Sequence, residues 1–135
     1  MIDVRTAPLG TLILRLALAA TFLAHGLDKI LTLSLQGTVD LYTAAGYPAA
    51  VAYLVIVSQV GGGLALLVGL WTRWVALLLC IEAVGMAVRH WSVGWFFGLP
   101  GGGWEFPALL AVALFVLSML GDGAMAFSGR AKSAA

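Results

Sequence analysis

Charged residues are scarce in this sequence, and so are the residue types that build disulfides and metal centres. Seven Lys and Arg and six Asp and Glu make up 10% of the 135 residues, for a formal net charge of +1. No basic run suits nucleic acid or anionic lipid, so we expect no nucleic-acid partner. The single cysteine, Cys80, excludes an intramolecular disulfide and a thiol pair for metal or redox chemistry.

Apolar residues are abundant instead, at 62% of the chain. They gather in stretches of about 17 to 23 residues, each long enough to cross a hydrocarbon core about 30 Å thick. We therefore predict an all-α integral membrane protein, a single domain formed by a four-helix transmembrane bundle, with no soluble catalytic domain. The predicted helices cover residues 9–30, 49–70, 72–90 and 105–120. The turn-prone segment between the first two, 32–48, has room for a short interfacial helix at 39–45.

The placement of Lys and Arg predicts the orientation of the bundle. Cytoplasmic loops of membrane proteins carry an excess of these residues. One predicted side has Arg5, Arg73, Arg130 and Lys132, and the other has Lys29 and Arg89. We therefore expect a multi-pass protein with both termini in the cytoplasm.

The helix surfaces predict close packing in one place and a buried polar layer in another. Gly61, Gly62 and Gly63 give the second helix a surface that another helix can approach. Counting about 1.5 Å per residue from the inner edges, Arg15 of the first helix and Glu82 of the third differ in depth by about 5 Å, with Gln59 at a similar level. We expect an ion pair between Arg15 and Glu82, which either fixes the helix packing or serves proton transfer.

A second polar cluster is expected near the outer leaflet, where the first and third helices end and the fourth begins. Its members are His25, Lys29, Arg89, His90 and Glu105. The aromatic and glycine-rich segment 91–107 would cover it. Cationic donors, a carboxylate and aromatic walls suit a quinone headgroup, whose carbonyls need donors and whose reduction needs protons. The alternative is that these side chains only extend to the phosphates and water of the interface.

Two metal hypotheses rank below the quinone hypothesis. His25 and His90 are candidates to ligate a haem between helices, or to form a metal site together with Glu105. The two histidines lack any close ligand spacing such as HExxH. We therefore expect no bound metal, disfavour haem, and predict no covalently bound cofactor.

Several dispersed segments resemble the DoxX family of small bacterial membrane proteins. They are LRLALAATFLAHGLDKI, AAGYP, QVGGGLALLVGLWTR, VRHW and LGDGAMAFSG. The resemblance implies a four-helix bundle in the bacterial inner membrane and a link to respiratory or sulfur redox chemistry, since related proteins include a subunit of thiosulfate:quinone oxidoreductase. The positions that match the family motifs are Arg15, His25, Gly26, Lys29, Gly62, Gly69, Thr72, Arg73 and His90. Family members often have a carboxylate where Gln59 stands, and Glu82 is a candidate substitute on the neighbouring helix.

The sequence favours a quinone-interacting subunit of a membrane oxidoreductase. We expect His25 and Lys29 to hydrogen-bond the quinone carbonyls, Arg89 to set the local field, and His90 or Glu105 to exchange protons with solvent. The polar layer of Arg15, Gln59 and Glu82 would support this site. Electrons would come from a partner, because the chain has no recognisable flavin, haem or iron–sulfur motif. Two alternatives remain: a non-catalytic accessory or assembly subunit, and a small-solute transporter that works as a homo-oligomer.

Overall fold

The computed structural model describes residues 3–128, and over that range the secondary structure is helical. The helices are α1 (Ala7–Leu31), α2 (Ser34–Ala44), α3 (Ala49–Val68), α4 (Thr72–His90) and α5 (Glu105–Leu120). The all-helical class is thereby confirmed, and the long helices lie within two residues of their predicted bounds. The short helix expected in the first loop is present as α2, and it begins five residues earlier than predicted.

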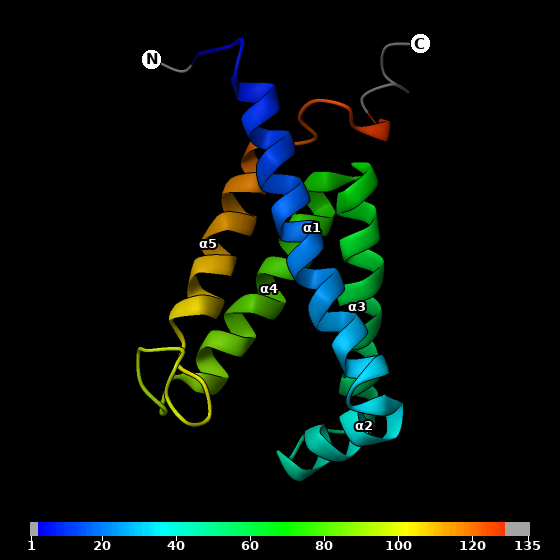
Figure 1. Cartoon of the computed structure of the whole chain (residues 1–135), viewed down its shortest axis with the longest axis vertical. Coiled ribbons are helices and arrows are strands. Elements are labelled where there is room, and N and C mark those ends of the chain that lie inside the picture. The colour runs from blue at the N-terminus through cyan, green and yellow to red at the C-terminus, as the bar shows by residue number, and fades with distance from the viewer. Residues whose placement is uncertain (1–2, 129–135) are drawn as a thin grey trace.

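The four long helices run alternately in opposite directions, and α2 lies at the end of the bundle opposite to the start of α1 (Figure 1). Helix α1 packs mainly on α3, and α4 packs mainly on α5. Helices α3 and α4 also contact each other and join the two pairs. The sequence had instead predicted a site shared directly by α1 and α4. In the structure α3 connects these two helices.

A three-residue link, Gly69 to Trp71, makes α3 and α4 antiparallel neighbours. Helix α3 ends at Gly69, which adopts the left-handed conformation with φ of 73°. Glycine suits this position because a Cβ atom strains left-handed backbone. Helix α4 begins directly after the link at Thr72, as predicted.

The three consecutive glycines of α3 pack as the sequence indicated. A Cβ at Gly63 would lie 2.8 Å from Cγ of Leu23 in α1, and one at Gly62 would lie 3.1 Å from the side chain of Leu79 in α4. Gly61 has no heavy atom within 4 Å of its Cβ position. Two of the three glycines therefore let neighbouring helices approach α3 closely, and the third leaves open surface.

Within residues 3–128, two helices are long and apolar enough to cross a membrane, namely α1 and α3. Helix α5 is strongly apolar but has 16 residues. Helix α1 begins and α5 ends at the same end of the bundle (Figure 1). Arg130 and Lys132, which contributed to the predicted orientation, lie outside the described residues.

Candidate functional site

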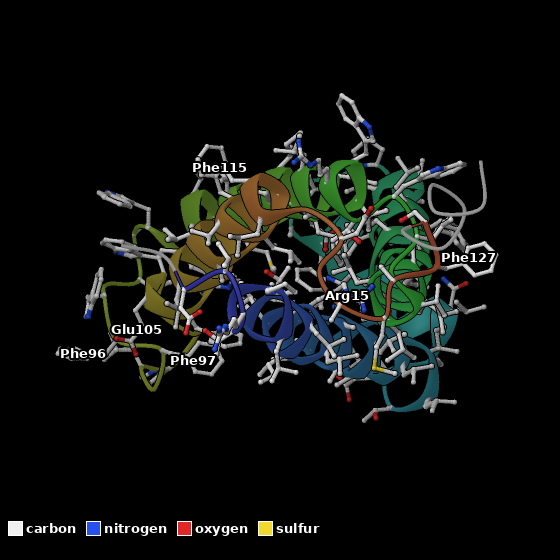
Figure 2. All side chains as sticks on the ribbon, turned by 90° about the horizontal axis from the view of Figure 1, so that it is seen from above. Arg15, Phe96, Phe97, Glu105, Phe115 and Phe127 are labelled. Carbon is white, nitrogen blue, oxygen red and sulfur yellow. The ribbon has the colours of Figure 1, made fainter. Side chains whose placement is uncertain are left out.

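Arg15 does not form the ion pair with Glu82 that the depth count predicted. Its Nη2 atom donates a hydrogen bond to the carbonyl of Ala124, at 3.2 Å, in the segment that follows α5. Asp122 of the same segment lies close enough to attract the guanidinium group. Figure 2, seen from the end where α1 begins, shows Arg15 within the curve of this segment. Arg15 is therefore separated from the polar layer of Gln59 and Glu82.

The reason is that residues 121–128 fold back over the end of the bundle. Ala124 N donates to the carbonyl of Pro8 at 3.0 Å, and the Ser128 hydroxyl donates to the carbonyl of Gly69 at 2.8 Å. Arg15 is 1% exposed beneath this segment. Among the described residues its Nε and Nη1 atoms have no hydrogen-bond partner. The arginine thus holds the beginning of α1 to the chain that follows α5.

Lys29, not Arg15, is the cation connected to Glu82. Lys29 Nζ donates to Gln59 Oε1 at 3.0 Å. The Gln59 amide nitrogen then donates to Glu82 Oε1. These three side chains come from α1, α3 and α4, so they form a hydrogen-bonded chain across the bundle, called here the Lys29–Gln59–Glu82 chain.

A close approach of α1 to α3 makes the Lys29–Gln59–Glu82 chain possible. A Cβ at Gly26 would lie 2.8 Å from Val60 Cγ2, 3.1 Å from Gln59 Cβ and 3.1 Å from the Val60 backbone nitrogen. A larger residue at Gly26 would push the helices apart. One turn further along α1, the Lys29 side chain then reaches the buried amide of Gln59.

Three further polar residues, Ser58, Thr38 and Tyr42, surround the Lys29–Gln59–Glu82 chain. The sequence indicated only that Tyr42 would lie in the loop covering the outer polar cluster, and it gave no role to Ser58 or Thr38. The Ser58 hydroxyl donates to Glu82 Oε2. The Thr38 hydroxyl of α2 donates to the carbonyl of Lys29 at 2.8 Å. Tyr42, also in α2, is half-buried near Glu82, and burial followed by the charge of that carboxylate raises the pKa of its phenol. The sequence feature that could have identified Ser58 is its position beside Gln59 in an otherwise apolar helix.

An apolar hollow of about 560 Å³ lies beside His25, between α5 and the loop that precedes it. Its lining residues are Trp95, Phe97, Glu105, Phe106, Ala108, Leu109 and Val112. The His25 ring is 6.1 Å from the ring of Phe106, measured between centroids. Glu105 Oε1 accepts a hydrogen bond from the backbone nitrogen of Phe97 at 3.0 Å. Figure 2 shows Phe97 and Glu105 on the loop side of the bundle, away from Arg15.

The predicted outer cluster is therefore divided. Lys29 turns to Gln59, Glu105 lines the hollow, and His25 lies against Phe106 of the hollow's wall. His90 donates from Nδ1 to the carbonyl of Met86 at 2.8 Å, which leaves its Nε2 atom facing the loop near Gly102. Arg89 is exposed at the end of α4. Over residues 3–128, the structure has no group of three or more His, Cys, Asp or Glu side chains placed to hold a metal ion, so His25, His90 and Glu105 are not gathered into one cluster.

The fold and this polar chain define a class of small helical membrane protein with ionisable groups inside the bundle. A family model described as DoxX matches residues 10–95, which is more than half of the chain, so the chain belongs to the DoxX family. A Bacillus subtilis protein named "Putative oxidoreductase CatD" is 29% identical over 114 residues, which cover 84% of this chain and 81% of the relative. No solved structure matches the chain significantly.

Proposed function

We propose that this protein is a membrane subunit of a quinone-linked oxidoreductase. All four long helices would cross the bacterial inner membrane, with both termini in the cytoplasm. The Lys29–Gln59–Glu82 chain carries the proposal, because a half-buried cation and carboxylate joined by a buried amide are costly in hydrocarbon and mark functional sites in membrane proteins. The name of the Bacillus subtilis relative supports a redox role.

The quinone headgroup would lie in the hollow beside α5, against the rings of Phe97 and Phe106. His25 lies against Phe106, which lines this hollow, and in this proposal it supplies a donor for one quinone carbonyl. Lys29 lies one helical turn away and uses two of its three N–H groups, on Gln59 and on the His25 carbonyl. One N–H of Lys29 remains for a second carbonyl. The headgroup thus meets aromatic walls and two donors from α1.

Three further residues act around the headgroup in this proposal. Arg89 adds positive potential at the end of α4. His90 and Glu105 exchange protons with water, since His90 Nε2 is free of the bond to Met86 and Glu105 is at the hollow. A bound quinone would supply the two-electron chemistry. The electrons would come from a partner subunit, and surrounding lipids would hold the isoprenoid tail.

The test is an oxidised-minus-reduced absorption spectrum of the detergent-purified protein with the molecules it retains from the membrane. We expect an ultraviolet quinone signal that is reduced at least tenfold in His25→Ala. Leu27→Ala is the matched control, because Leu27 is exposed on the same turn of α1 and lies outside the site. A signal unchanged in His25→Ala would remove His25 from the site, and a haem signal would replace the quinone proposal.

A second candidate function is that of an accessory or assembly subunit. The observation that favours it is open helix surface at Gly61 of α3 and Gly85 of α4, where no heavy atom lies within 4 Å of the Cβ position. Small residues of this kind let a partner helix approach closely in membranes. Stable co-purification with a membrane partner, lost in Gly61→Leu and retained in His25→Ala, would favour this role over quinone binding.

A further inference from the structure

Glu82 lies in a hydrogen-bond arrangement that accommodates its carboxyl group both with and without a proton. We propose that Glu82 exchanges a proton inside the bundle, in addition to the exchange of His90 and Glu105 with water at the hollow, and that Ser58 is the positioning residue that serves both protonation states of Glu82. The coupling of this proton to quinone chemistry rests on the function proposed above. The proton exchange itself is a property of Glu82 and its neighbours, and it is measurable without quinone.

The Ser58 hydroxyl has two hydrogen-bond partners in the structure but only one proton to donate. Its oxygen lies within hydrogen-bond distance of Glu82 Oε2 and, at 3.0 Å, of the Val55 carbonyl oxygen. When Glu82 is ionised, the hydroxyl donates to the carboxylate. When Glu82 is protonated, the carboxyl O–H donates to Ser58 Oγ and the hydroxyl turns to Val55. Both states keep their hydrogen bonds without moving a heavy atom.

Gln59 keeps the other carboxylate oxygen in place in both states. Its carbonyl oxygen accepts from Lys29, so its N–H₂ group must face Glu82. This orientation means that the proton enters and leaves at Oε2, on the Ser58 side. Glu82 Oε1 stays an acceptor throughout.

The charged and titratable groups around Glu82 come from the other elements packed nearby. Helix α1 contributes Lys29, whose ammonium group lies close enough to the carboxylate for the two charges to attract. Helix α2 contributes Tyr42, a neutral phenol whose raised pKa keeps its proton in the physiological range. In this proposal Tyr42, which is half-buried in the helix at this end of the bundle, relays protons between Glu82 and water.

The proposed step is balanced. Reducing a quinone to a quinol takes two electrons, here from the electron-donating partner, and two protons. Glu82 releases one proton and becomes the carboxylate bound by Ser58 and Gln59. The second proton comes from His90 or Glu105, which regain it from water. Glu82 then regains its proton from water past Tyr42. Oxidation of a quinol is the same sequence reversed.

The experiment is an infrared pH-difference titration of the full-length protein in lipid, without added quinone. We expect a distinct C=O stretching band of a protonated carboxyl to grow on acidification and to be absent in Glu82→Gln. The same band should remain in the matched control Asp40→Asn, because Asp40 is exposed in α2, bonds to Gln36 and lies outside the site. Ser58→Ala should move the midpoint of the band up by about one pH unit, because the carboxylate loses one of its donors. Lys29→Met should move the midpoint up as well.

The proposal is overturned if this band survives in Glu82→Gln, or if it disappears in Asp40→Asn. If Glu82→Gln fails to fold, Ser58→Ala provides the test instead. A band whose midpoint and frequency are both unchanged in Ser58→Ala also overturns the proposal. The titration is then repeated with a short-chain quinone. A Glu82 band without any quinone binding leaves the proton site standing and defeats only the proposed function.

Discussion

Replacing Gly69 with alanine should be among the most destabilising small changes in this protein. Two separate effects act at this position. Gly69 has φ of +73°, in the left-handed region, and its Cβ position is 1.5 Å from Nη1 of Arg15 and 2.7 Å from Cβ of Ala126. An alanine must therefore adopt strained backbone and also displace the buried guanidinium from the carbonyl of Ala124.

The expected loss follows from these two contributions. Left-handed backbone costs an alanine about 1–2 kcal/mol, and losing a hydrogen bond from a charged donor costs about 1.5–3 kcal/mol. We expect Gly69→Ala to lower the free energy of unfolding by about 2.5–5 kcal/mol. Gly46 is the matched control, because it has φ of +87° and no heavy atom within 4 Å of its Cβ position. Gly46→Ala should cost only about 1–2 kcal/mol.

The assay is reversible unfolding in mixed detergent micelles, followed by tryptophan fluorescence. Gly69→Ala should lower the free energy of unfolding by more than Gly46→Ala does. When both substitutions are made in an Arg15→Ala background, this difference should fall by more than half, because the clash with the guanidinium is gone and only the contact with Ala126 remains. If Gly69→Ala costs no more than Gly46→Ala, the guanidinium does not occupy the space beside Gly69 and the account of Arg15 is refuted.

Three further predictions concern the other end of the bundle. Gly26→Ala should destabilise by about 1–3 kcal/mol, since it overpacks the contact of α1 with α3, and Gly61→Ala should be neutral or stabilising in the same unfolding assay. Gln59→Met should lower the free energy of unfolding by at least about 3 kcal/mol, because Lys29 and the carboxylate of Glu82 lose the amide that both of them bind. Tyr42 has a raised pKa, so its stabilising contribution is full below the unfolded pKa of about 10 and is lost as pH rises through the folded value. Unfolding of Tyr42→Phe measured against pH should lack that alkaline loss.

The sequence determined the helices of this protein because each depends mainly on local apolar composition and on where that composition is interrupted. The bounds of α4 and α5 match the prediction at both ends. The role of Gly62 and Gly63 as contact surface also follows locally, since a side-chain-free face admits a neighbour in any bundle. The sequence likewise selected Lys29, Gln59 and Glu82 as the polar groups that apolar surroundings must accommodate.

Only the tertiary structure decided which polar groups meet. A depth count from the helix ends paired Arg15 with Glu82, because it took the helices as parallel rods and left out both the pairing of α1 with α3 and the returning chain. The hydrogen bond of Arg15 joins residues 109 positions apart and depends on how 121–128 folds back. Lys29 reaches Gln59 only because Gly26 lets α1 and α3 come close. Contacts of this kind depend on helix crossing and chain return, which local composition does not specify.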